Sequence, residues 1–139
     1  MEVSLQAVWG GFVASIVWFI IGGALYMNPI IARIYKTFDD APVMKQWPDI
    51  PRYLFLMYAG TLAQCVLWAF VYIWVKPVLP DSIVGIGVVF GLMLVATKIF
   101  PRFFDMWIQT TYPNKLLGIE LINGSIGSIV IAVVFAFMI

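Results

Sequence analysis

The sequence predicts an all-α integral membrane protein, a single domain of four transmembrane helices formed by residues 1–139. Composition is the first reason. Hydrophobic residues make up 63% of the chain and charged residues 11%, against roughly 45–50% and about 25% in soluble domains. A chain this apolar cannot cover a surface that faces water, so lipid must be its solvent. The second reason is a set of four apolar stretches, each long enough to cross the roughly 30 Å hydrocarbon layer as a helix.

The four expected spans take up most of the chain. They are residues 7–27, 53–75, 82–100 and 116–139. Strand-like alternation is missing from them, which argues against a membrane barrel. The only charged residue before the first span is Glu2, and no small-residue cleavage pattern follows it, unlike a secretory signal. We therefore expect the first span to be retained as a helix of the bundle.

Basic residues favour one orientation. Seven of the eight lysines and arginines lie at the connections after the first and third spans, and the connection after the second span carries only Lys76. Cytoplasmic loops are enriched in such residues. We therefore expect an N-out/C-out protein of the bacterial inner membrane, with the termini in the periplasm. The two longer connections would lie in the cytoplasm and carry short interfacial helices.

Aromatic residues near the span ends fit the same arrangement. Amphipathic rings favour the headgroup region of a bilayer. The residues that we assign to this interfacial belt are Tyr26, Tyr35, Trp47, Tyr53, Tyr72, Trp74, Trp107 and Tyr112.

Small residues recur at every fourth position in two spans. They are Gly87 and Gly91 in the third span and Gly124, Ser128, Ala132 and Ala136 in the fourth. Helices in lipid associate through close backbone approach and a few polar contacts. We therefore expect these positions to be helix-packing seams, which face either another helix of the chain or a partner subunit.

Five residues form a candidate polar intramembrane site: Gln64, Lys98, Arg102, Glu120 and Asn123. Gln64 lies near mid-membrane and should point into protein, because an unpaired amide in lipid is costly. Glu120 lies about one turn inside the fourth span, with Asn123 on the same helix face. One interpretation is a structural ion pair of Glu120 with Lys98 or Arg102. The other is a proton- or cation-linked site formed by Glu120, Asn123 and Gln64.

For Lys98, Arg102 and Asp105 the alternative interpretation is that they are anchors at the bilayer surface. Lys98 can reach the interface with its long side chain, and Arg102 and Asp105 would be neighbours on one helix face. Pro101 predicts a bend or a helix restart near Phe100.

Several functional classes are excluded or disfavoured. Histidine is absent, so histidine-ligated haem or chlorophyll and histidine-based catalysis are excluded. The single cysteine, Cys65, is expected to be a buried packing residue. The sequence shows no phosphate-binding loop, metal-ligand cluster or nucleophile–base pair, and no basic stripe typical of nucleic-acid binding. We expect no enzymatic activity, no cofactor and no nucleic-acid partner, whereas a bound lipid is compatible with the sequence.

Three short motifs carry a resemblance: GGALYMNP (22–29), FPRFFD (100–105) and LING (121–124). Together they resemble a family of small four-helix bacterial membrane proteins that is catalogued as a domain of unknown function. That family often has a bulkier aromatic or a tyrosine-glycine pair where this chain has Tyr26, Met27 and Asn28. The resemblance implies a four-span fold and no particular activity.

The leading functional hypothesis is a non-enzymatic membrane protein that acts by helix packing, as an accessory or structural subunit of a larger membrane complex or as a homo-oligomer. Its basis is the number of small-residue seams and the lack of catalytic residues. The alternative is a small carrier or channel for an ion or small molecule that uses Glu120, Asn123 and Gln64. A third hypothesis is lipid or quinone binding by the aromatic-rich second span.

Overall fold

The computed structural model describes all residues 1–139, and every regular element is helical. In chain order the elements are α1 (Glu2–Tyr26), α2 (Pro29–Lys36), α3 (Ile50–Val75), a 3-10 turn (Lys76–Val78), α4 (Ile83–Leu94), a π-helical turn (Val95–Ile99), α5 (Phe100–Gln109) and α6 (Asn114–Met138). Four helices are long and apolar enough to cross a membrane: α1, α3, the continuous helix from α4 to α5, and α6. The predicted all-α class and the four candidate spans are confirmed, and each helix is longer than its predicted span.

Short polar residues determine where three helices begin. The Asn28 side chain accepts a hydrogen bond from the Ile30 N–H at 2.9 Å, and the Ser82 hydroxyl accepts one from the Gly85 N–H at the same distance. Asp49 caps α3 in the same way. Each bond satisfies an N–H group of the first turn that has no partner inside the helix.

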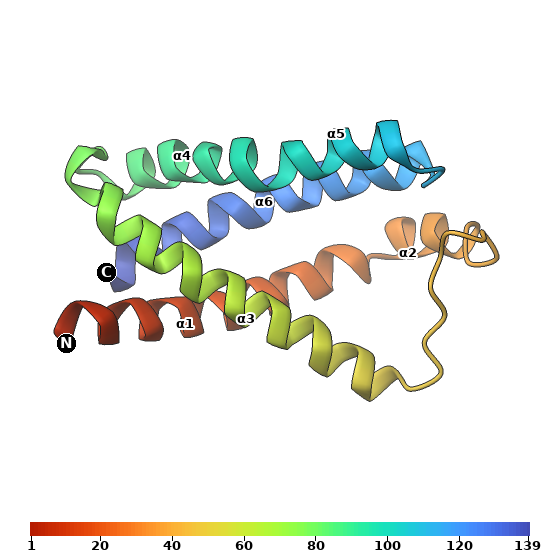
Figure 1. Cartoon of the computed structure of the whole chain (residues 1–139), viewed down its shortest axis with the longest axis horizontal. Coiled ribbons are helices and arrows are strands. Elements are labelled where there is room, and N and C mark those ends of the chain that lie inside the picture. Colours follow the sequence, from red (N-terminus) through yellow and green to blue (C-terminus); the bar gives the residue numbers. More distant parts are fainter.

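The third long helix differs from the prediction. Instead of restarting near Phe100, α4 runs into α5 through the π-helical turn (Figure 1). There the Phe100 N–H donates to the carbonyl of Val95, one residue further back than in an α-helix. Proline lacks an N–H and its ring crowds the preceding turn, and we attribute the continuity to the wider π turn, which accommodates Pro101. Of the bend and the restart that Pro101 predicted, only the restart is wrong, because α5 is the end of a long helix.

The long helices meet at one end of the molecule and spread apart at the other. α1 packs on α3 and on α6, and α4 packs on α6. Near the two termini, the Tyr72 ring of α3 lies 5.1 Å from Phe90 of α4 and 5.5 Å from Phe135 of α6, measured between centroids. All three residues are fully buried. Tyr72 is thus a core residue, and its assignment to an interfacial belt is wrong.

The opposite end is called here the basic end, and it comprises α2, residues 37–49 and residues 110–113. Toward this end α3 diverges from α5 and α6 (Figure 1). The helix axes are therefore further apart at the basic end than near the termini.

The predicted seams lie inside the chain. A Cβ on Gly87 would lie 2.7 Å from the Val133 side chain, and one on Gly91 would lie 3.0 Å from the Ile129 Cα, so both glycines face α6. The seam positions of α6 are also in contact with the bundle: Gly124 faces Ile99, Ser128 and Ala132 are fully buried, and Ala136 packs against the core.

α1 and α3 approach each other closely at Gly11. A Cβ there would lie only 2.6 Å from the Cα of Val66. One turn further along α1, the Ser15 and Tyr58 hydroxyls are hydrogen-bonded at 3.1 Å. Cys65 is buried beside this contact, as predicted. Small side chains thus allow the two helix backbones to touch.

Candidate functional site

A cavity of about 830 Å³ lies between the diverging helices. Its walls come from α1, α3, the helix from α4 to α5, and α6, and Tyr35 of α2 and Met44 also line it. Fifteen of its 23 lining residues are hydrophobic, among them Trp18, Phe19 and Met57. Its volume falls within the range of roughly 300–1,000 Å³ that is usual for ligand pockets. The cavity is therefore the main candidate for a functional site.

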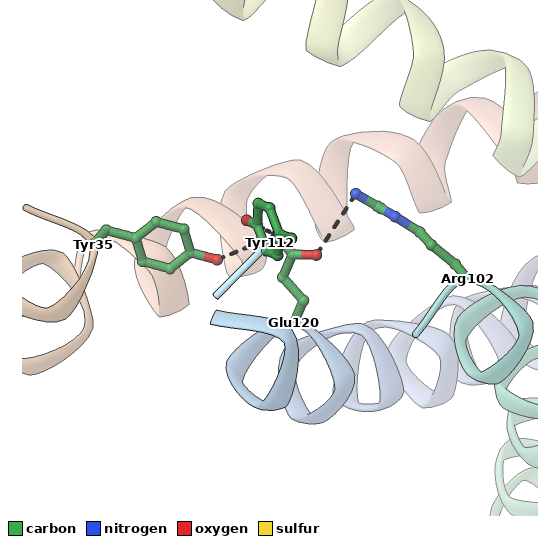
Figure 2. Close-up of polar contacts among 4 residues, drawn as sticks. All are labelled: Tyr35, Arg102, Tyr112 and Glu120. Atoms are coloured by element: carbon green, nitrogen blue, oxygen red, sulfur yellow. Dashed lines mark hydrogen bonds and ion pairs between the residues drawn. The ribbon is translucent and has the colours of Figure 1, made fainter. Parts of the chain in front are cut away.

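Glu120 is the best-connected polar residue of the cavity wall (Figure 2). Its carboxylate accepts a hydrogen bond from the Tyr112 hydroxyl at 2.7 Å and a longer one from the Tyr35 hydroxyl at 3.4 Å. Its other oxygen forms an ion pair with Arg102 at 3.6 Å. The Glu120 side chain is 22% exposed and that of Arg102 is 68% exposed. The charge of Glu120 is thus compensated by three donors from three different elements.

The two tyrosines are brought to Glu120 by different parts of the chain. Tyr112 lies in the connection before α6, eight residues from Glu120. Tyr35 lies on α2, where its ring packs edge-on against Tyr26 at 5.9 Å. Burial raises the pKa of both Tyr35 and Tyr112 above the usual tyrosine value, and the nearby Glu120 carboxylate raises it further. Both hydroxyls therefore stay protonated at neutral pH and donate to the carboxylate.

Lys98 differs from Arg102 in having no partner. Both side chains line the cavity, but only Arg102 pairs with Glu120. Lys98 is half-buried on the π-helical turn and contributes to the cavity wall together with Gln64, Arg102 and Glu120 of the predicted site. Asp105 and Arg102 lie three residues apart on α5, as expected, and both are exposed, but they form no ion pair.

The predicted trio of Glu120, Asn123 and Gln64 is divided. Gln64 and Glu120 line the same cavity, but Asn123 does not. Asn123 is buried, and its amide nitrogen has no hydrogen-bond partner within the chain. Glu120 thus reaches the cavity wall, whereas Asn123 is buried within the bundle, although the two residues are only three positions apart.

Sequence reasoning assigned four tyrosines only to an interfacial belt and missed their place in the cavity. Tyr26, Tyr35, Tyr53 and Tyr112 line the cavity, and Tyr35 and Tyr112 bind Glu120. The only local signal was the closeness of Tyr112 to Glu120 in sequence. Tyr35 is 85 residues from Glu120, so only the packing of α2 near α6 brings them together.

No group of three or more acidic, cysteine or histidine side chains in the chain is arranged to hold a metal ion. No family model, curated protein or solved structure matches the chain. The resemblance to a four-helix family therefore stays a prediction, and function has to be argued from the cavity.

Proposed function

We propose that this chain is an integral membrane protein that binds a small amphiphile in its cavity, as a binding protein or a carrier. The apolar part of the ligand lies against Trp18, Phe19 and Met57, and its polar part lies beside Lys98, Arg102 and Glu120. One observation supports this function above all: a cavity of about 830 Å³ with mostly apolar walls and one charged cluster. Ligand sites typically combine an apolar lining with a few placed polar groups.

The same geometry supports an amphiphile over a bare ion. An ion site needs several polar ligands around one point. Both carboxylate oxygens of Glu120 are already engaged by protein donors, and Asn123 lies outside the cavity wall. An apolar ligand part would instead fill the large remaining space without leaving unpaired polar groups.

A pair of glycines provides a matched test. A Cβ on Gly23 or on Gly60 would meet no other residue within 4 Å, but only Gly23 lines the cavity. Gly23→Phe should fill part of the cavity and lower amphiphile binding at least about tenfold, whereas Gly60→Phe should leave binding unchanged. Native mass spectrometry of the protein in a bulky steroidal detergent would count bound dodecyl probes with glycerol, carboxylate or phosphate heads. If no probe binds, or if both variants bind like the wild type, the proposed function is wrong.

We also propose the orientation indicated by the basic residues, with both termini in the periplasm of a bacterial inner membrane. Two exposed positions test it without changing any lysine or arginine: Val78, which is 85% exposed, and Asp40. In a Cys65→Ala background, an impermeant maleimide should label Val78→Cys on intact cells and Asp40→Cys only after permeabilisation. The reverse labelling pattern would require the opposite orientation.

A second candidate function is that of an accessory subunit or a homo-oligomer. It is supported by the sparse packing of α3, which lies mainly on α1 and exposes a face that carries Ala59, Gly60 and Ala63. Small residues of this kind allow close approach of another helix. Under this hypothesis Gly60→Phe should dissociate a complex that gentle detergent preserves, while Gly23→Phe should not.

A further inference from the structure

We propose that the cavity selects an amphiphile with an anionic head, a carboxylate or a phosphate, and that Lys98 binds this head. The inference rests on the proposed function and specifies its ligand. It follows from the charges that line the cavity and from the partners that each of them has.

Three charged residues line the cavity: Lys98, Arg102 and Glu120. Arg102 and Glu120 pair with each other, and two tyrosine hydroxyls complete the surroundings of the carboxylate. Lys98 forms no ion pair with Glu120 or with any other carboxylate of the chain. Because no other acidic residue lines the cavity, the wall carries one positive charge that the protein does not balance.

The position of Lys98 makes this imbalance costly. It lies on the π-helical turn inside a helix that is long and apolar enough to span a membrane, and it is half-buried. A charged group that leaves water is destabilising unless a counter-charge or hydrogen bonds compensate it. An anion in the cavity would give the Lys98 ammonium group a counter-charge and hydrogen-bond acceptors.

Gln64 provides a second, independent donor. It lies on α3, on a different wall of the same cavity, and its side chain is exposed. Lys98 and Gln64 are thus two donors of one cavity that no acceptor of the chain occupies. The oxygens of a carboxylate or a phosphate could accept from both groups, whereas a cationic head would be repelled by Lys98.

The test compares dodecyl probes that share one tail and differ in the head: dodecanoate, dodecyl phosphate, dodecyl glycerol and dodecylammonium. Wild-type protein should bind at least one anionic probe about tenfold more tightly than the glycerol probe, because hydrogen bonds between ionised partners are roughly twice as strong as neutral ones. The dodecylammonium probe should bind most weakly.

A preference for dodecanoate would indicate a fatty-acid-type ligand, and a preference for dodecyl phosphate would indicate a phosphate-ester lipid. Either preference supports the inference. Inorganic phosphate alone should not compete; competition equal to that of dodecyl phosphate would contradict an amphiphile site.

Variants connect the preference to Lys98. Lys98→Gln should abolish the preference for anionic heads, and Lys98→Arg should retain it. Lys115→Gln removes an exposed lysine outside the cavity wall and should change nothing. The thermal transition of each ligand-free variant monitors folding.

The inference is overturned if anionic and glycerol probes bind wild-type protein equally, or if Lys98→Gln keeps the preference. If Gly23→Phe still blocks binding in that case, the cavity function stands and only the head-group assignment fails. If Gly23→Phe blocks nothing, the cavity function itself fails.

Discussion

Replacing Gly11 with leucine is expected to prevent α1 from packing on α3 and to leave little folded protein. A Cβ at this position would lie 2.6 Å from the Cα and 2.8 Å from the backbone nitrogen of Val66. A helix backbone cannot move aside as a flexible side chain can, so the two helices would have to separate. Even Gly11→Ala should destabilise the fold by about 1–3 kcal/mol, the usual cost of overpacking. Thermal unfolding in detergent, followed by aggregation, would measure this loss.

The sign of this effect is informative, because alanine normally stabilises a helix by up to about 1 kcal/mol relative to glycine. Gly60→Ala provides the control, since a Cβ there meets no other residue within 4 Å. We expect Gly60→Ala to be neutral or stabilising. Equal stability of the Gly11→Ala and Gly60→Ala variants would show that α1 and α3 are further apart than described.

Removal of the Glu120 carboxylate is expected to loosen α2 from the rest of the bundle. Glu120→Leu would leave the Tyr35 and Tyr112 hydroxyls without their acceptor and Arg102 without its ion-pair partner. The loss should be on the order of 1–3 kcal/mol for the hydrogen bonds, with little from the exposed ion pair. Glu120→Gln keeps an acceptor oxygen for the tyrosines and should cost much less. The measurement is the rate of protease cleavage within residues 37–49, which follow α2.

Asp105→Leu is the matched control, because Asp105 is an exposed carboxylate with no ion-pair partner. It should leave the cleavage rate unchanged. Tyr35→Phe should reproduce part of the effect of Glu120→Leu, since it removes the tyrosine bond that joins α2 to Glu120. Glu120→Leu and Asp105→Leu with the same cleavage rate would contradict a role of Glu120 in holding α2.

The sequence by itself determined the helical class and the four candidate spans. Lipid offers no hydrogen bonds to backbone N–H and C=O groups, so a membrane-spanning segment must form its own as a helix. Its side chains must also be apolar over about 20 residues. Both properties belong to the segment itself and can be read from its sequence. The positions where helices approach each other closely were also largely predictable. Gly87 and Gly91 lie against α6 because a helix needs small residues wherever it touches another backbone. Among the charges, the sequence offered Lys98 and Arg102 as partners of Glu120, and the structure pairs Glu120 with Arg102.

Only the tertiary structure decided which way each helix faces. In a soluble helix, polar residues mark the face that points to water, but an apolar helix can turn any side to lipid or to protein. For this reason the sequence could not show that Tyr72 is buried or that Asn123 lies outside the cavity wall. The contact between Tyr35 and Glu120 depends on how α2 folds back near α6. The cavity exists because α3 diverges from its neighbours, and the angle between helices is set by packing across the whole bundle, not by any one segment.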